Sequence, residues 1–484
     1  MTTELRSYIG GNWRDGVRTM EDINPANPQE VVAEVSMGNA SLAVAAVEAA
    51  DAAAASWRST PAPTRGEILR KAADLLEQRA ATVGRDLTRE EGKTLTEGIG
   101  ETKRAVAILR YYAGVTLDAD GETYPSHSPR TFLFALREPI GVVAVITPWN
   151  FPIAIPAWKI APALAYGNTV VWKPAELVPL TAMHLLQALV DAGLPKGVLN
   201  VVLGKGSEVG EVLTTHEGID ALTFTGSNVV GRSIQLKATE HGKKVQLEMG
   251  GKNPSVVLAD ADLPLAVEQV ARGAFLSAGQ KCTATSRVIV EKPVVEEFQE
   301  RLGTIAKSWK LGNPLEEDTK VGPVVSKDQM QTVLGYIEMG EKEGGHFVAG
   351  GKRASELGDG YYVQPTVITD LGHESRVSRE EIFGPVATII PASSYEEAVK
   401  LANDTPFGLT ASLFTRDLTK ALRFVNDIRV GVAKINQESA GLEYQVPFGG
   451  AKESSSGSRE QGQAAKEFFT QWKTVYMDQV PTEQ

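Results

Sequence analysis

Residues 142–152 read Val142-Val143-Ala144-Val145-Ile146-Thr147-Pro148-Trp149-Asn150-Phe151-Pro152. Five consecutive apolar residues followed by a proline predict a short strand that is buried on both faces. Similar apolar runs occupy residues 169–172, 198–203, 221–224 and 244–247, and helical patterns such as 180–192 separate them. Buried strands alternating with helices predict a doubly wound parallel sheet, which binds ligands beyond the carboxyl ends of its strands.

A second series of strands and helices follows Gly251. Its strand-like runs are residues 255–258, 287–290, 387–390 and 409–414, and one of its helices begins with the capping box Ser394-Tyr395-Glu396-Glu397. Residues 40–115 are rich in alanine and charged residues, so they predict helices that cover the first sheet. We therefore expect two α/β halves, a cofactor half and a catalytic half, with the break near Gly250-Gly251.

Composition excludes several classes of function. The 484 residues are 42% hydrophobic and 23% charged, an ordinary mix for a globular protein of two or three domains. The net charge of −11 argues against nucleic acid as a partner, because binding phosphates needs a basic face. The N-terminus lacks the apolar core of a signal peptide, and no segment offers the ~18 uninterrupted apolar residues of a membrane span. A reducing, cytoplasmic location is expected.

Cys282 is the only cysteine, so it forms no intramolecular disulfide. It lies in the run Gly279-Gln280-Lys281-Cys282-Thr283-Ala284-Thr285-Ser286-Arg287, after an apolar helical pattern that extends to residue 278. One interpretation is a small buried core residue. Its small, hydroxylic and cationic neighbours favour another, a partly exposed thiol whose lowered pKa makes it a nucleophile.

Two further side chains suit catalysis. Glu248 ends an apolar stretch and precedes two glycines that permit close approach of a ligand, as expected for a general base aimed into a cavity. A solvated acid or a salt-bridge partner is the alternative for this residue. Asn150 stands between two prolines, where its amide either satisfies its own turn or donates to an oxyanion.

These segments, in the same order along the chain, resemble the NAD(P)-dependent aldehyde dehydrogenase superfamily. Four more motifs carry the resemblance: Lys173-Pro174-Ala175-Glu176, Phe224-Thr225-Gly226-Ser227, Glu380-Glu381-Ile382-Phe383-Gly384-Pro385-Val386 and Pro447-Phe448-Gly449-Gly450. The resemblance implies an aldehyde dehydrogenase-like α/β fold of two Rossmann-like doubly wound parallel-sheet domains plus a small β-flap. It places the dinucleotide-binding domain at residues 1–120 and 140–250, the catalytic domain at 251–450, and the flap at 121–139 and 465–484.

The flap residues include two aromatic, strand-like segments, 131–137 and 468–476, which alone would form sticky edge strands. In the family such a flap pairs between subunits, so the resemblance implies a homodimer or homotetramer.

The resemblance also implies a dinucleotide site. Gly204, Gly206 and Gly210 are spaced one residue away from the Rossmann fingerprint, so that motif alone does not predict the cofactor. By resemblance, Ser227 contacts the pyrophosphate from a helix N-terminus. The implied cofactor residues are Ile146, Thr147, Pro148, Trp149, Lys173, Glu176, Gly206, Gly210, Phe224, Thr225, Gly226, Ser227, Glu381 and Phe383. Glu176 favours NAD because its carboxylate repels a 2′-phosphate, while Lys173 leaves NADP possible.

The implied mechanism needs no metal. Cys282 attacks the aldehyde, the Asn150 side chain and the Cys282 backbone N–H hold the oxyanion, and Glu248 activates the water that hydrolyses the thioester. A CoA-acylating enzyme has no use for Glu248, and a glyceraldehyde-phosphate-type enzyme would need a histidine beside the cysteine. A non-catalytic structural relative remains the third alternative.

Substrate choice rests on the helix expected over residues 101–112. By resemblance, Arg104 lies at a position where relatives that act on apolar aldehydes carry an uncharged residue. A guanidinium binds a carboxylate through paired hydrogen bonds. The other tunnel residues implied are Phe151, Ile155, Trp158, Leu442 and Phe448, with Lys281 as a competing anchor; a solvated charge is the alternative for Arg104. The segments 279–287 and 459–470 most resemble α-ketoglutaric semialdehyde dehydrogenases, which indicates a short ω-carboxy aldehyde such as 2,5-dioxopentanoate. A betaine-aldehyde or broad-specificity enzyme is the alternative.

Overall fold

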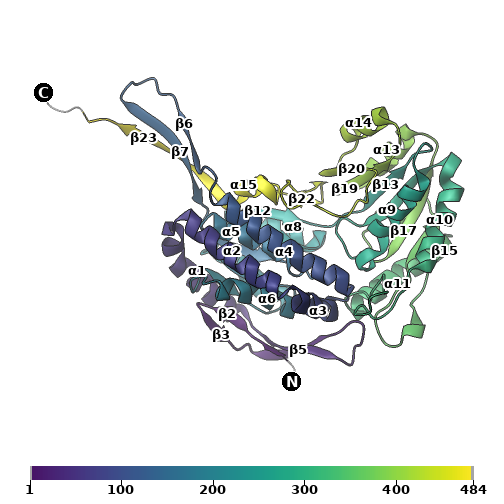
Figure 1. The fold of residues 1–484 in the computed structure, drawn as a ribbon, viewed down its shortest axis with the longest axis horizontal. Helices are drawn as coiled ribbons and strands as arrows, with labels where there is room; N and C mark the ends of the chain where they lie inside the picture. The colour runs from purple at the N-terminus through teal and green to yellow at the C-terminus, as the bar shows by residue number, and fades with distance from the viewer. Residues whose placement is uncertain (1–2, 481–484) are drawn as a thin grey trace.

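An eight-stranded sheet forms the centre of the larger lobe (Figure 1), in a computed structural model that describes residues 3–480. The strand order is β22-β12-β11-β8-β9-β10-β2-β3. The strands are β2 (Ser7–Ile9), β3 (Asn12–Arg14), β8 (Val142–Ile146), β9 (Thr169–Lys173), β10 (Leu199–Val201), β11 (Ala221–Thr225), β12 (Lys244–Glu248) and β22 (Ser455–Ser456). The five predicted strands are mutually parallel, which confirms the doubly wound sheet.

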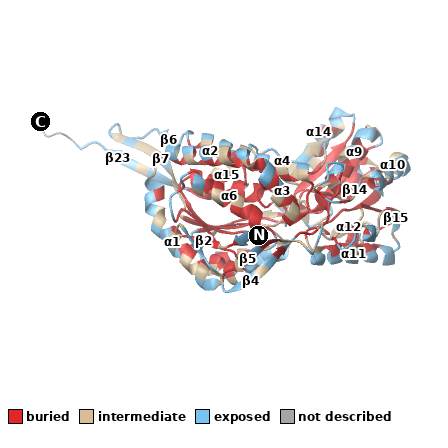
Figure 2. Ribbon diagram, turned by 60° about the horizontal axis from the view of Figure 1, so that its bottom comes forward, coloured by how far each residue is buried: buried red, intermediate tan, exposed pale blue. Residues whose placement is uncertain are grey.

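Helices cover both faces of this sheet. They are α1 (Ala40–Ser59), α2 (Ala62–Gln78), α3 (Ala80–Glu91), α4 (Leu95–Val115), α5 (Ala154–Ala165), α6 (Pro179–Asp191), α7 (Glu211–Thr215) and α8 (Asn228–Glu240). The prediction of helices over residues 40–115 is confirmed. One apolar cluster, with Trp57 and Trp172, fills one face, and another, with Val47 and Leu222, fills the other. The strands are accordingly buried while the outer helix faces are exposed (Figure 2).

A seven-stranded sheet forms the second lobe, in the order β15-β16-β17-β14-β13-β19-β20. Its strands are β13 (Asn253–Val257), β14 (Thr285–Glu291), β15 (His346–Ala349), β16 (Thr366–Thr369), β17 (Val386–Ala392), β19 (Thr410–Phe414) and β20 (Val432–Ile435). Its helices are α9 (Leu263–Phe275), α10 (Val295–Ser308), α11 (Lys327–Lys342), α12 (Arg376–Arg379), α13 (Tyr395–Asn403) and α14 (Leu418–Asp427).

The capping box predicted at α13 forms only in part. The Ser394 side chain accepts from the Glu397 backbone N–H, as predicted. The Glu397 side chain accepts from the backbone N–H of Ser393, one residue before the cap. Reciprocal pairing with Ser394 itself was therefore a wrong prediction, and the helix still begins at the expected residue.

Smaller elements complete the chain. Residues near the N-terminus form a three-stranded sheet that the sequence did not predict, β1 (Thr3–Leu5), β5 (Val31–Met37) and β4 (Arg18–Ile23), and β18 (Phe407–Gly408) pairs with β21 (Ala451–Lys452). Short turns of helix lie at residues 206–210, 276–279, 292–294, 355–357 and 462–464. Among the helices of residues 3–480, none is long and apolar enough to cross a bilayer.

The flap is a three-stranded antiparallel sheet that projects from the larger lobe (Figure 1). It consists of β6 (Gly121–Tyr124), β7 (Thr131–Pro139) and β23 (Thr470–Asp478). The strand predicted from residue 468 begins only at Thr470, because buried Phe468 and Phe469 end helix α15 (Ala465–Phe469) and anchor the flap. Residues 481–484 of the predicted flap and residues 1–2 of the predicted first domain lie outside the described residues.

Candidate active site

A sharp bend in the backbone leads to the cysteine. Helix α9 ends at Phe275, so the prediction of a helical pattern through residue 278 was wrong. Ser277, Ala278 and Gly279 all adopt left-handed conformations, with φ of 56°, 51° and 68°. Two of these residues carry side chains, so the bend stores backbone strain of the kind that collects at functional sites. At the third, a Cβ would lie 2.2 Å from the Gly384 carbonyl oxygen, so only glycine fits.

Cys282 follows this bend at the wall of a cavity of about 210 Å³. Its carbonyl accepts from Asn253 Nδ2 at 2.8 Å, and the same amide nitrogen donates to the Ala284 carbonyl at 2.9 Å. These bonds hold the loop to the start of strand β13. The thiol is half-buried and free, so the core-residue interpretation of Cys282 is not what the structure describes.

Burial raises the pKa of the Cys282 thiol to about 12, with further contributions from Glu248 and Glu381. The prediction of a lowered pKa was therefore wrong for the protein without ligands. The physical reason is the sign of the nearby charge. Neighbouring carboxylates oppose a thiolate, whereas the Lys281 ammonium donates to the Arg272 carbonyl at 3.2 Å.

Asn150 lines the same cavity as Cys282. The cavity is lined by Pro148, Trp149, Asn150, Thr225, Gly226, Ser227, Met249, Gly250, Cys282, Gln329, Glu381 and Phe383. The Asn150 side chain is buried, and its Nδ2 donates to the Gln280 carbonyl at 3.0 Å. An amide nitrogen carries two hydrogens, so this bond orients the group and leaves a second N–H for a ligand.

Glu248 ends strand β12, as predicted, but does not line the cavity of Cys282. Its Oε2 accepts from Ser455 Oγ at 2.5 Å, and a Cβ on Gly449 would lie 2.6 Å from its Oε1. Burial, reinforced by Glu460, raises the pKa of Glu248 well above the ordinary value. Glu248 is buried and forms no ion pair with any residue of 3–480, so it is neither the solvated acid nor the salt-bridge partner of the alternative interpretation.

A buried ion pair that the sequence interpretation missed lies behind Glu248. Lys159 Nζ pairs with Glu460 Oε1 and donates to Thr223 Oγ1 at 2.8 Å, and Trp158 Nε1 donates to Glu460 Oε2 at 2.8 Å. One signal was available, because Lys159 is the only charged residue within helix α5. Its partner lies 301 residues later and could not have been found from spacing.

A second cavity, of about 860 Å³, lies at the carboxyl ends of the first sheet's strands. It is lined by twelve of the predicted cofactor residues, Ile146, Thr147, Pro148, Trp149, Lys173, Glu176, Gly206, Gly210, Phe224, Thr225, Gly226 and Ser227. Five of them, Pro148, Trp149, Thr225, Gly226 and Ser227, also line the cavity of Cys282. The two cavities therefore share a wall.

The polar groups of the larger cavity fit a dinucleotide. Ser227 is the N-cap of α8 and makes no side-chain capping bond, so its hydroxyl and the helix N-terminus are available to a phosphate. Glu176 Oε1 accepts from the Gly206 N–H at 2.8 Å and lies 3.8 Å from Lys173 Nζ. Burial lowers the pKa of Lys173.

Glu381 and Phe383, the remaining predicted cofactor residues, line the cavity of Cys282 instead. Glu381 Oε1 accepts from the Gly251 N–H at 2.9 Å, and burial raises its pKa to about 7. A Cβ on Gly250 would lie 2.2 Å from the Glu381 carboxylate, which explains the glycine there. The Phe383 ring meets that of Trp149 edge-on at 5.3 Å.

A third cavity, of about 720 Å³, is lined by Arg104, Leu442 and Phe448 among others. Arg104 Nη1 donates to the Leu442 carbonyl, while its buried Nη2 finds no hydrogen-bond partner among residues 3–480. This guanidinium is therefore not the solvated charge of the alternative interpretation. The other predicted substrate residues, Phe151, Ile155, Trp158 and Lys281, do not line this cavity, although the Trp158 ring packs 6.0 Å from that of Phe448.

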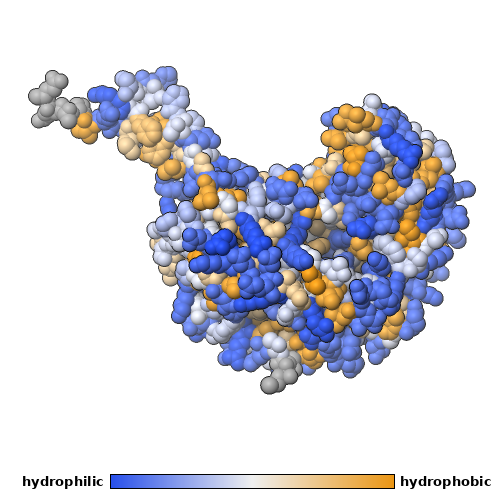
Figure 3. Space-filling model, in the orientation of Figure 1, coloured by the Kyte–Doolittle hydropathy of each residue, from blue (hydrophilic) through white to orange (hydrophobic). Residues whose placement is uncertain are grey.

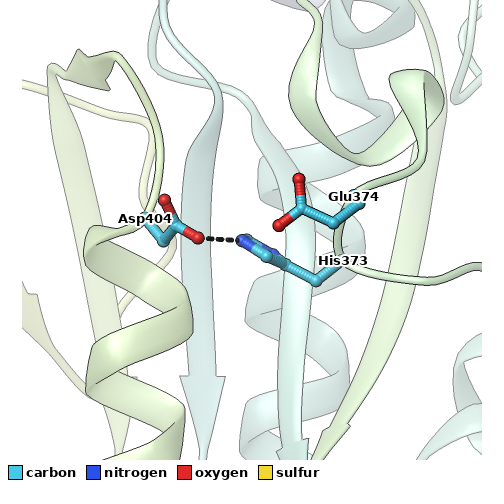
Figure 4. Close-up of side chains that lie close together, drawn as sticks. All are labelled: His373, Glu374 and Asp404. Carbon is cyan, nitrogen blue, oxygen red and sulfur yellow. Dashed lines mark hydrogen bonds and ion pairs between the residues drawn. The ribbon is translucent and has the colours of Figure 1, made fainter.

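One group of potential metal ligands occurs within residues 3–480, His373, Glu374 and Asp404 (Figure 4). His373 Nε2 lies 2.8 Å from Asp404 Oδ2. Arg379 Nη1 reaches Glu374 at 3.2 Å and Asp404 at 3.6 Å. With a guanidinium bound to both carboxylates, the group is an ion-pair cluster, and nothing in its geometry assigns a metal to it.

The fold and site together define an α/β protein in which a half-buried cysteine and an amide donor line a cavity that shares a wall with a larger one at the strand ends. The sequence pattern of the aldehyde dehydrogenase family matches residues 13–475. The chain therefore belongs to the aldehyde dehydrogenase family.

Individual relatives extend this finding over nearly the full length. The chain is 48% identical to the alpha-ketoglutaric semialdehyde dehydrogenase of Bacillus subtilis, over 97% of each chain. It is 43% identical to the 2,5-dioxopentanoate dehydrogenase of Saccharolobus solfataricus, over 98% of this chain and 99% of the relative. A crystal structure of betaine aldehyde dehydrogenase from Staphylococcus aureus with NAD+ has a TM-score of 0.95 and 37% identity, covering 99% of this chain and 95% of that one.

Proposed function

We propose that this protein is a non-acylating, NAD-dependent aldehyde dehydrogenase that oxidises a short ω-carboxy semialdehyde, such as 2,5-dioxopentanoate, to the acid. The observation that carries the proposal is that Cys282 and Asn150 line one cavity, which shares a wall with the cavity lined by the cofactor residues. The 48% identity to an alpha-ketoglutaric semialdehyde dehydrogenase supports the substrate class.

The first chemical step belongs to Cys282. Its thiolate attacks the aldehyde carbon, and the carbonyl oxygen becomes an oxyanion that Asn150 Nδ2 and the Cys282 backbone N–H hold. Loss of one such donor typically costs about 10²–10³ in rate. Because the thiol pKa is about 12 without ligands, a positive charge beside the thiol is needed to populate the thiolate near neutral pH.

NAD bound in the large cavity would supply that positive charge and accept the hydride. Ser227 and the N-terminus of α8 would hold its pyrophosphate, and Glu176 with Lys173 its adenosine ribose. Glu381 and Phe383, on the cysteine side of the shared wall, would hold the nicotinamide end. Lys173 lines the same cavity and could attract a 2′-phosphate, so NADP is the alternative cofactor.

Glu248 serves as the base for the second step. It takes a proton from the water that attacks the thioester, which breaks the C–S bond and returns the thiolate. Its carboxylate must first leave Ser455, because in the structure it is bonded there and does not line the cavity of Cys282. Its raised pKa makes its carboxylate a stronger base than an ordinary glutamate.

Arg104 supports a carboxylate at the far end of the substrate. A buried guanidinium nitrogen without a partner is costly, and a bidentate carboxylate would satisfy it. The same cation would repel the trimethylammonium group of betaine aldehyde, which is the second candidate because of the relatives of that name.

The experiment is a turnover panel with NAD. We expect 2,5-dioxopentanoate to have the highest kcat/KM, succinic and glutaric semialdehydes to follow, and betaine aldehyde and uncharged aldehydes of equal length to be poorer. A preference for betaine aldehyde would overturn the substrate assignment and keep the dehydrogenase. Absence of NAD-dependent turnover of any aldehyde would favour a non-catalytic relative.

We further propose a homodimer or homotetramer, joined through the flap. Its strands expose Phe132, Leu136, Trp472, Tyr476 and Met477, and Figure 3 shows apolar side chains gathered on this projection. Large exposed apolar patches mark interaction surfaces. The domain division at Gly250-Gly251 and a reducing, cytoplasmic location, which suits a catalytic thiol, belong to the same proposal.

A further inference from the structure

One face of helix α4 holds three loops of the site. Glu97, Glu101 and Arg104 are spaced four and three residues apart, so they share that face. Glu97 Oε1 accepts from Ser277 Oγ at 2.8 Å, in the bend before the cysteine. Arg104 reaches the carbonyl of Leu442. The middle residue of the three faces the loop that carries Asn150.

Glu101 grips the end of that loop. Its Oε1 accepts from the backbone N–H groups of Ile153 and Ala154, both at 3.1 Å, where the twelve-residue helix α5 begins. A carboxylate at a helix N-terminus satisfies donors that have no partner within the helix and interacts favourably with its dipole. The carboxylate therefore fixes the residues that follow Asn150.

Lys93 grips the loop on its other side. Its Nζ pairs with Glu101 Oε2 at 2.8 Å and donates to the carbonyl of Asn150 itself. It also lies 3.7 Å from the centre of the Phe151 ring. The paired side chains are only 1% and 2% exposed, so water does not screen the contact. Glu101 and Glu91 raise the pKa of Lys93 although burial opposes them, so it remains an ammonium.

The loop depends on such outside contacts because Pro148 and Pro152 have no backbone N–H to donate. The side-chain amide of Asn150 has a contact of its own, with the Gln280 carbonyl at 3.0 Å. The direction of the amide is set jointly by this bond and by the position in which Lys93 and Glu101 hold the backbone. A shift of the backbone by a fraction of an ångström would move the second N–H away from a bound aldehyde oxygen.

We propose that Lys93 and Glu101 are positioning residues that hold the Asn150 amide where the aldehyde oxygen becomes an oxyanion. The proposal rests on the proposed function, since it gives Asn150 a role only in an enzyme that stabilises an oxyanion. Neither residue lines the cavity of Cys282 or the cavity of Arg104, so their proposed effect on the reaction runs through the loop that carries Asn150.

The test is a double-mutant cycle on the full-length enzyme. Glu101→Gln keeps an acceptor oxygen of similar size without the charge, and Lys93→Met removes the donor to the Asn150 carbonyl. Each is expected to lower kcat about 10- to 100-fold, below the 10²–10³ of a lost oxyanion donor, with the KM for aldehyde and the Kd for NAD changed less than about threefold. In an Asn150→Ala background, either substitution is expected to cost less than about threefold more, because the group that they position is gone.

Glu97→Gln is the matched control on the same helix face. Glu97 contacts the bend before Cys282 and not the Asn150 loop. The fold-losses in kcat caused by Glu97→Gln and by Asn150→Ala should therefore multiply in the double variant. Lys93→Arg keeps the charge and a donor and is expected to recover most of kcat. Thermal unfolding checks that each variant is folded, and active-site titration relates kcat to the amount of active enzyme. If a single variant fails to fold, the double variant Lys93→Met/Glu101→Gln, which removes both charges of the pair, is measured in its place.

Two outcomes overturn the proposal, and they are distinguishable. If Glu101→Gln lowers kcat as much in the Asn150→Ala background as in the wild type, Glu101 has a general structural role and the dehydrogenase assignment stands. No NAD-dependent aldehyde turnover by the wild type, or no loss on Asn150→Ala alone, would remove the oxyanion role and with it the positioning role.

Discussion

Ser455 Oγ donates a 2.5 Å hydrogen bond to Glu248 Oε2, across the antiparallel pair of strands β22 and β12. The bond stabilises the charged carboxylate, while burial and Glu460 favour the neutral acid. It also occupies one oxygen of the group that is proposed to activate water. Strand β22 therefore influences both the charge and the direction of the Glu248 carboxylate.

The first prediction concerns this bond. Ser455→Ala removes a bond to the charged form, so the pKa of Glu248 rises further. Only ionised Glu248 accepts a proton, so kcat rises with pH through this pKa, and the acidic limb should move to higher pH. A hydrogen bond to a charged group is worth about 1.5–3 kcal/mol, or about 1–2 pH units. Ser456→Ala is the control, because its hydroxyl accepts from Gln235; equal shifts in both variants would contradict the argument.

Cys282→Ser should lose nearly all dehydrogenase activity and any esterase activity, because a hydroxyl is a far weaker nucleophile than a thiolate. Initial rates with NAD and aldehyde, and with an activated ester alone, measure the two activities. Unchanged thermal unfolding would show that the fold is kept. More than a tenth of wild-type turnover would remove Cys282 as the nucleophile.

Glu248→Gln should stall the reaction after the hydride has left the substrate. Rapid mixing is expected to show a burst of NADH close to one per active site, followed by slow turnover, since only deacylation needs the base. Mass spectrometry of the stalled enzyme should find the acyl group on Cys282. Linear kinetics at the wild-type rate would exclude Glu248 from hydrolysis.

Glu176→Ser should shift the ratio of kcat/KM from NAD toward NADP, because a carboxylate near a 2′-phosphate repels it and a hydroxyl does not. Lys173 remains in the variant to attract the phosphate. We expect wild type to prefer NAD, as measured with both cofactors at one aldehyde concentration. A wild type that prefers NADP would disprove this role for Glu176.

Arg104→Leu should raise the KM for ω-carboxy semialdehydes about 10- to 100-fold, in line with a charged hydrogen-bonded contact of about 1.5–3 kcal/mol. Uncharged aldehydes of equal length should keep their KM. Lys103→Leu, the exposed neighbour on the same helix, is the control. An unchanged semialdehyde KM would refute the anchor and leave the dehydrogenase assignment intact.

Much of the fold could be predicted because its signals are local. The apolar runs ending at Ile146 and Phe224 became parallel neighbours in the first sheet. The residues that follow such strands line the two adjoining cavities, because parallel strands bring their carboxyl ends to one edge. Among the unpredicted N-terminal strands, β1, β3 and β4 are mostly exposed and so lack the apolar signal of the central strands. Strand β5 is largely buried and carries that signal, and the sequence interpretation missed it.

The sequence by itself determined the two parallel sheets, the flap strands and the identity of Cys282, Glu248 and Asn150 as candidates. Apolar periodicity and short motifs are properties of neighbouring residues. Only the tertiary structure decided that the thiol pKa is raised, that Glu248 is bonded to Ser455, and that Lys93 and Glu101 hold the Asn150 loop. Burial and ion pairing depend on groups that lie far apart along the chain, and only folding sets the distances between them.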